Sequence, residues 1–122
     1  MPNIKVVLYK ENDEAVPLLD WFDEIPARAR AKCLARIERL GKLGHELRRP
    51  EADYLRDGIH ELRASLQGVH YRMLYFFHGR VAVVISHGMV KIREVPPAEI
   101  DRAIDRMQKY LSAPAKHTFE EG

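Results

Sequence analysis

Residues 59–93, IHELRASLQGVHYRMLYFFHGRVAVVISHGMVKIR, contain the longest apolar runs of the chain. The pattern predicts three successive strands, at residues 59–66, 69–77 and 81–87. Short turns at Gly68 and Gly79 join them, so we expect an antiparallel meander. The second and third strands are apolar on both faces, which is typical of interior strands.

The segments before this stretch predict one more strand and two helices. The β-rich run from Ile4 to Tyr9 is expected to pair with an edge of the meander. Pro17 suits the first turn of a short helix. Residues 27–43 predict a longer helix, with an apolar stripe formed by Leu34, Ile37, Leu40 and Leu43. Residues 45–58 are polar and include Pro50, which indicates a loop.

After the meander, Pro96 and Pro97 end the extended structure and begin a last helix. The order of elements predicts an α+β domain: a mainly antiparallel twisted sheet of about four strands, two N-terminal helices and a C-terminal helix. We expect the helices on one face of this sheet and a partly open second face. Residues 1–112 are expected to form a single domain, and residues 113–122 a frayed tail.

The composition is that of a globular protein: 122 residues, 46% hydrophobic, 31% charged and a net charge of +2. The single cysteine, Cys33, is expected to be a small buried residue, and it fits a reducing compartment. No signal-peptide core and no apolar run of transmembrane length is visible. These features predict a cytoplasmic protein without a membrane partner.

Positive charge is concentrated in the central stretch, whereas acids gather near the two ends. Between residues 56 and 93 the cations are Arg56, Arg63, Arg72, Arg80, Lys91 and Arg93, against the acids Asp57 and Glu61. The predicted helix at 27–43 is also basic on several faces. Such a face could contact nucleic acid, although the pattern alone favours a solvated surface over a buried stripe.

The residue types exclude several kinds of site. The six histidines are scattered without metal-ligand spacing, and there is neither a phosphate-binding glycine loop nor a nucleophile elbow. What remains is a set of cations on neighbouring strands, with the aromatic side chains of Tyr71, Tyr75 and Phe76 close in sequence. Cations of this kind bind phosphates, and aromatic rings stack on unpaired bases.

Each of these cations also has a structural interpretation. Glu61 and Arg63 could form an ion pair or face a ligand. Arg72 lies within an apolar run, so it must either pair with Glu61 or line a cleft. His87 ends an apolar strand, where histidines in the core are more common than catalytic ones. Lys91 could belong to a solvated sheet edge.

Four short motifs occur in order: IHELR at 59–63, YRMLYF at 71–76, HGMVK at 87–91 and PPAEIDRA at 96–103. Together they resemble the RelE/HigB toxin superfamily, and most closely the phage-derived HigB-like branch of type II toxin–antitoxin systems. The resemblance runs from Glu61 to Tyr110 and implies a RelE-like fold. Two positions depart from the family pattern, since Met89 replaces a usual phenylalanine and Ile92 replaces a usual second lysine.

The resemblance implies a toxin that cleaves mRNA, usually on the ribosome, without a metal or other cofactor, and so inhibits translation. It implies that Arg63 and Arg72 hold the scissile phosphate, that Lys91 adds charge and that His87 acts as an acid or base. The remaining candidates for RNA contact are Tyr75, Arg93, Arg56 and His70. The implied protein partner is an antitoxin of the helix-turn-helix type.

Two alternatives remain open. The missing second lysine is compatible with a non-cleaving module that binds nucleic acid or protein on the same scaffold. A gyrase-inhibiting toxin of the ParE type would share the fold. The HGMVK strand end and the histidines favour the RNA-cleaving branch.

Overall fold

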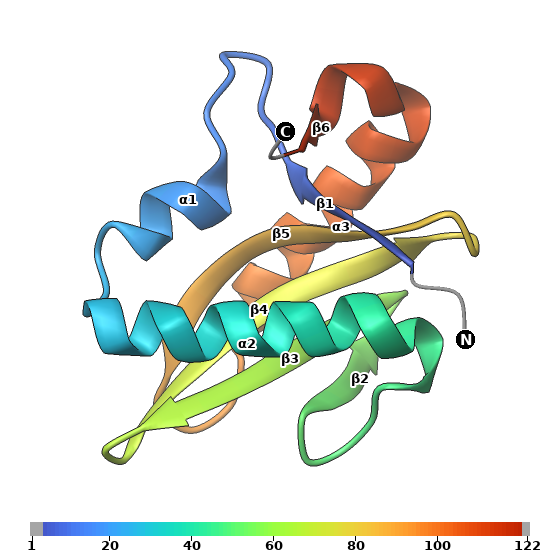
Figure 1. The fold of residues 1–122 in the computed structure, drawn as a ribbon. Helices are drawn as coiled ribbons and strands as arrows, with labels where there is room; N and C mark the ends of the chain where they lie inside the picture. Colours follow the sequence, from blue (N-terminus) through green and yellow to red (C-terminus); the bar gives the residue numbers. More distant parts are fainter. Residues whose placement is uncertain (1–3, 121–122) are drawn as a thin grey trace.

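The computed structural model describes residues 4–120, and the chain folds into one mixed sheet flanked by three α-helices (Figure 1). The elements in chain order are β1 (Lys5–Tyr9), α1 (Pro17–Phe22), α2 (Ala27–Leu43), the 3₁₀ helix η1 (Gly44–Glu46), β2 (Ala52–Arg56), β3 (Ile59–Leu66), β4 (Val69–His78), β5 (Ala82–Lys91), α3 (Pro97–Ser112), the 3₁₀ helix η2 (Pro114–His117) and β6 (Thr118–Phe119). The strand order is β2-β3-β4-β5-β1-β6, and only the β1–β5 pairing is parallel.

The predicted meander is confirmed and is one strand longer than expected. Two of its turns are tight because both central residues adopt positive φ: Asp57 and Gly58 between β2 and β3, and Gln67 and Gly68 between β3 and β4. The predicted first strand is also confirmed, and it pairs with β5 at the edge of the meander.

The prediction of about four strands was wrong, because the described part of the chain contributes six. β2 lies within the predicted loop at 45–58, where it is only five residues long and stands between Pro50 and Gly58, two residues that indicate a loop. β6 lies within the predicted frayed tail. Residues 114–119 form η2 and β6, and β6 pairs with β1.

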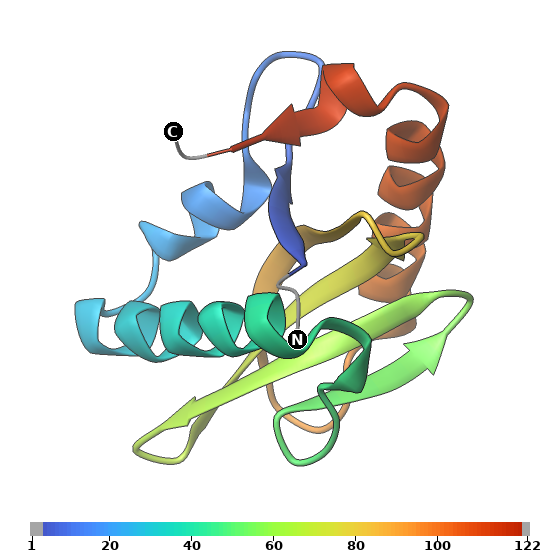
Figure 2. The ribbon, with the colours of Figure 1, turned by 45° about the vertical axis from the view of Figure 1, so that its right-hand side comes forward.

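The helices cover both faces of the sheet, so the prediction of helices on one face was also wrong. α1 and α2 pack on one face against Leu62, Met73 and Ile85, whereas α3 packs on the other face over Ile59 and Phe76. Figure 2 shows α2 and α3 on opposite sides of the strands. The reason is that the interior strands are apolar on both faces, and each face requires its own cover.

The buried side of α2 includes three residues of the predicted stripe, Ile37, Leu40 and Leu43, but not Leu34. Ala29, Cys33 and Leu40 are fully buried, whereas Leu34 is 49% exposed. The small residues Ala29 and Cys33 let α2 approach the sheet closely, and Leu34 lies on the outer side of the helix. The prediction for Cys33 is confirmed, and burial raises the pKa of its thiol to about 11. No helix within residues 4–120 is long and apolar enough to cross a membrane.

Candidate functional site

The strand register brings most of the predicted site residues onto one face of the sheet. Arg63 on β3 lies opposite Arg72 on β4, and Ser65 lies opposite His70. On the other side of β4, His70 lies opposite Lys91 of β5. Directly opposed side chains in a sheet are close neighbours. One basic cluster therefore forms on the part of this face that α3 does not cover, and its members are Arg63, Arg72, His70 and Lys91.

Arg63 and Arg72 share the carboxylate of Glu61, which is only 3% exposed. Arg63 Nη2 lies 2.8 Å from Glu61 Oε2 and 3.3 Å from Asp53 Oδ2. Arg72 Nε lies 3.3 Å from Glu61 Oε1, but this contact is not aligned as a hydrogen bond. The Arg72 Nη1 group instead donates to the carbonyl oxygen of Tyr71. Burial lowers the pKa of Arg72, and Glu61 partly offsets this effect.

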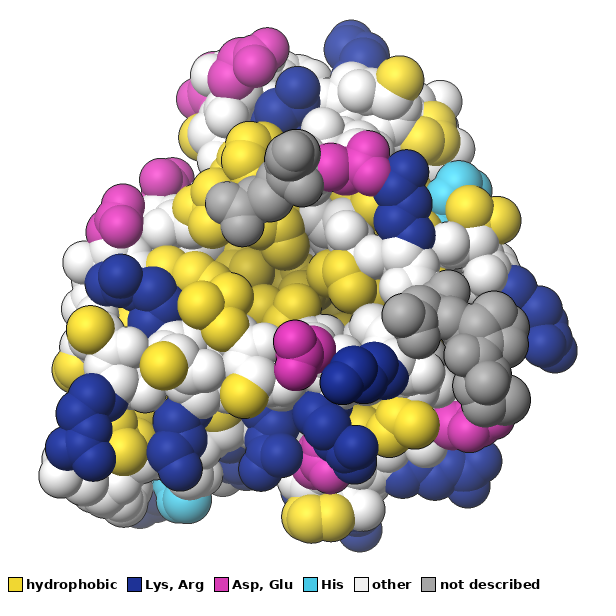
Figure 3. All heavy atoms as spheres, viewed as in Figure 1, with side chains coloured by type: hydrophobic (Ala, Val, Ile, Leu, Met, Phe, Trp, Pro, Cys, Tyr) yellow, Lys and Arg dark blue, Asp and Glu magenta, His cyan; other side chains and the backbone are white. Residues whose placement is uncertain are grey.

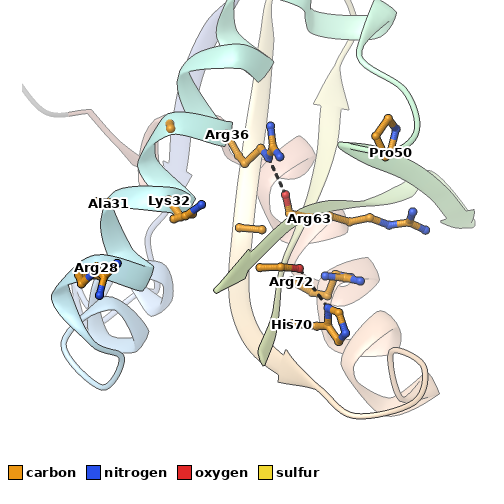
Figure 4. Close-up of a pocket in the computed structure, with 11 residues that line it drawn as sticks. Arg28, Ala31, Lys32, Arg36, Pro50, Arg63, His70 and Arg72 are labelled. Carbon is orange, nitrogen blue, oxygen red and sulfur yellow. Dashed lines mark hydrogen bonds between the residues drawn. The ribbon is translucent and has the colours of Figure 1, made fainter. Parts of the chain in front are cut away.

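An open groove of about 810 Å³ runs from this cluster to α2. Both alternatives for Arg72 are thus realised, because it pairs with Glu61 and also lines a cleft. In Figure 4 the α2 residues stand on one side of the groove and Arg72 and His70 on the other. The lining consists of Arg28, Ala31, Lys32, Ala35, Arg36, Pro50, Arg63, Ala64, Ser65, His70 and Arg72.

Arg36 fixes the separation of the two walls. Its Nε group donates to the carbonyl oxygen of Arg63 at 3.0 Å, and its guanidinium also pairs with Glu51. The contact is available because β2 pairs with only the first half of β3, as far as Leu62. The second half of β3 is therefore a free strand edge, and α2 lies along it.

His70 is the histidine that lies in the groove. It is exposed, and its Nδ1 atom is 3.1 Å from Ser65 Oγ. Lys91 lies beside it on β5, just outside the lining of the groove. Among the described residues, Lys91 has no ion-pair partner.

His87 is on the same sheet face but lies under α3 and is only 6% exposed. Its Nε2 atom is 2.9 Å from Glu99 Oε1, and its Nδ1 atom is 2.8 Å from Ser86 Oγ. The carboxylate only accepts hydrogen bonds, so Nε2 carries the proton and Nδ1 accepts from the serine hydroxyl. Burial lowers the pKa of His87 to about 4, although Glu99 opposes the shift. The structure thus places this residue as a link between β5 and α3, outside the groove.

Three other predicted residues do not join the cluster. Tyr75 is 1% exposed in the core on the α2 side, where its ring stacks on His60, so it offers no surface for a base. Arg56 pairs with Asp57 and Asp101 and ties β2 to α3. Arg93 is exposed in the loop that follows β5.

The structure adds residues that the sequence did not single out. Asp53 lies in the predicted loop and completes the Arg63–Glu61 network. Arg28, Lys32 and Arg36 form one side of α2, and the i, i+4 spacing of three cations was a visible signal. Within residues 4–120, no group of three or more histidine, cysteine, aspartate or glutamate side chains could hold a metal ion.

The motif glycine Gly88 has a packing role. A Cβ atom at this position would lie 2.2 Å from the indole ring of Trp21 in α1. The absence of a side chain lets α1 pack against β5 on the sheet face opposite to the cluster.

The chain was compared with known protein families and with curated proteins. Residues 20–108 match the family described as Phage derived protein Gp49-like (DUF891). No curated protein matches the chain. The matched region extends from α1 through most of α3 and includes both walls of the groove. The chain therefore belongs to the phage-derived Gp49-like family, a RelE/HigB-type toxin family that is associated with toxin–antitoxin systems.

Proposed function

We propose that this protein is the toxin of a type II toxin–antitoxin pair of the HigB-like branch, and that it cleaves mRNA in the groove beside Arg63 and Arg72. The observation that carries the proposal is the register that opposes these two arginines at the groove wall, with His70 next to them. The family supports a toxin with an antitoxin partner. The substrate, the ribosome and a cytoplasmic site of action are part of the proposal.

The chemistry requires a phosphate held among cations and a proton acceptor near the attacking oxygen. The RNA 2′-hydroxyl attacks the adjacent phosphorus and loses its proton, and the 5′-oxygen leaves as a hydroxyl after it gains one. The products are a 2′,3′-cyclic phosphate and a 5′-hydroxyl end. Arg63 and Arg72 would stabilise the charge that builds up on the phosphorane oxygens.

His70 is better placed than His87 for proton transfer. It is exposed in the groove beside both arginines, whereas both ring nitrogens of His87 are occupied under α3. Lys91 would add positive charge next to His70. In this proposal His87 is a positioning residue that holds β5 to α3, and Tyr75 has no contact with RNA.

The test has a cellular and a purified arm. Induced expression should arrest growth, and primer extension on total RNA should show discrete cuts within translated reading frames. With purified protein and mRNA bound to purified ribosomes, cleavage should leave a 2′,3′-cyclic phosphate and a 5′-hydroxyl end. His70→Ala should lower the cleavage rate by about 10²-fold or more, because a general acid or base contributes about 10²–10⁴-fold.

His70 is exposed, so its replacement should leave the thermal unfolding midpoint unchanged, which separates catalysis from folding. A matched control is His45→Ala, which replaces an exposed histidine outside the groove. Intact mRNA together with inhibited DNA supercoiling would instead support the gyrase-inhibiting alternative. Full cleavage by His70→Ala would overturn the assignment of the acid or base.

A further inference from the structure

Two cations on α2 lack the hydrogen-bond or ion-pair partners that the other arginines of this helix have. Arg36 and Arg39 share Glu51, and Arg30 donates to the carbonyl oxygen of Phe22. Arg28 and Lys32 are exposed, line the groove and make no ion pair or side-chain hydrogen bond with the described residues. Their positive charge therefore remains available to a ligand.

The positive charges of Arg28 and Lys32 are also unfavourable for the stability of α2. Arg28 lies in the first turn of α2, where the helix dipole favours negative charge, and that turn contains no acid. Arg28 and Lys32 are four residues apart, and a like-charged pair at this spacing destabilises an isolated helix by about 0.2–0.5 kcal/mol. An anion bound between this wall and the sheet would relieve both effects.

The groove has the shape for a strand rather than for a single ion. Between its cations the α2 wall carries Ala31 and Ala35, and these small side chains leave the groove open. Four helical residues span roughly 6 Å, which is comparable to the separation of consecutive phosphates in a single strand. In Figure 3 several Lys and Arg side chains form a row along α2.

We infer that α2 is the second wall of a track for single-stranded RNA, in which Arg28 and Lys32 hold phosphates that flank the one at Arg63 and Arg72. The inference rests on the proposed function for the identity of the polymer. It assigns a binding role to a helix whose sequence alone favoured a solvated face. Arg36 acts differently, since its hydrogen bond to β3 keeps the two walls of the track together.

The test measures RNA binding separately from cleavage. A single-stranded oligoribonucleotide with 2′-O-methyl groups lacks the attacking hydroxyl, so its fluorescence anisotropy reports affinity alone. Each phosphate contact in a single strand contributes about 0.7 to the slope of log affinity against log salt. The double variant Arg28→Gln/Lys32→Gln should therefore lower that slope by about 1.4 and weaken binding roughly tenfold at about 100 mM salt.

The control is Arg80→Gln/Lys116→Gln, which removes the same charge from two exposed cations outside the groove. It should change affinity less than about twofold. A second groove variant, Ala35→Glu, puts a carboxylate at an exposed position of the α2 wall. It should weaken RNA binding without lowering the unfolding midpoint.

Equal binding by the groove variant and the control would overturn the inference. The inference would also be overturned if Arg28→Gln/Lys32→Gln lost affinity only for an acidic protein and kept its affinity for RNA. If the wild-type protein binds the modified strand through the groove but never cuts the unmodified one, the track stands and the proposed endoribonuclease activity fails.

Discussion

One face of the sheet contains two regions built from the same strands. At one end α3 covers Leu74, Phe76 and Val84, and all three side chains are fully buried. At the other end α3 does not cover the sheet. There Arg63 and Arg72 occupy the strand positions that point to this same face. The comparison shows that strand alternation sets the face of a side chain, whereas the reach of one helix decides whether that position belongs to the core or to a site.

The boundary between the two regions is marked by polar side chains that are buried but partnered. His87 meets Glu99 at the edge of α3, and Glu61 meets Arg63 and Arg72 at the edge of the groove. A β-bulge lies at the same level, where the β4–β5 register shifts between Leu74 and Tyr75. Bulges commonly redirect side chains beside sites.

The largest expected effect lies in the covered region. Phe76 is fully buried, and its ring meets Tyr110 of α3 edge-on at 5.8 Å. Phe76→Ala should lower the free energy of unfolding by about 3–5 kcal/mol, because a cavity replaces the ring. Urea denaturation measures this change. His70→Ala, on the open half of the same strand and on the same face, should change it by no more than about 0.5 kcal/mol. Similar losses for the two variants would erase the distinction between the regions.

The sequence predicted the covered region better than the open one. Apolar runs identify β4 and β5 because burial on two faces requires them, and alternating apolar residues identify β3. The placement of α3 on the far face, however, depends on the length and path of the segment after Lys91, and no local pattern encodes this path. His87 and His70 lie on the same sheet face, and α3 covers only His87.

The short strand β2 is another part of the site that the sequence did not predict. It is too short, and too close to Pro50 and Gly58, to be predicted as a strand, yet Asp53 on it completes the charge network of the site. The groove itself exists because β2 stops short of the second half of β3. Strand length at a sheet edge is set by tertiary pairing, so neither feature could be derived from periodicity.

The next effect concerns His87 at the boundary and depends on pH. Its folded-state pKa is about 4, below the ordinary value of about 6.5, so the folded protein binds this proton less readily than the unfolded chain. The corresponding stability is complete above pH 6.5 and is lost as the pH falls from 6.5 towards 4. Between pH 6.5 and 5 the expected loss is about 2 kcal/mol, at roughly 1.4 kcal/mol per pH unit.

His87→Gln isolates this contribution because glutamine cannot take up the proton. Denaturation at pH 7 and pH 5 should show that the wild-type protein loses about 2 kcal/mol more than the variant. His70→Gln is the matched comparison in the open region, where the histidine is exposed. An identical pH dependence of wild type and His87→Gln would show that α3 does not hold this histidine in its neutral form.

The smallest effect concerns the family's missing second lysine. Ile92 is 90% exposed, directly after the end of β5, and alternation turns it away from the side of Lys91. Ile92→Lys should change the free energy of unfolding by no more than about 0.5 kcal/mol. The new charge would face solvent on the side opposite to His70. Because salt screens exposed charges, RNA affinity should rise by less than about threefold.

Ile92→Gln is the control, since it makes the position polar without adding charge. A rise in cleavage of tenfold or more with lysine but not with glutamine would mean that the RNA path turns around the end of β5 and uses both of its sides. The open region would then extend beyond the sheet face shared by Arg63, Arg72 and His70. A small and equal effect of both variants would confine the site to that face, with Lys91 as its last cation on β5.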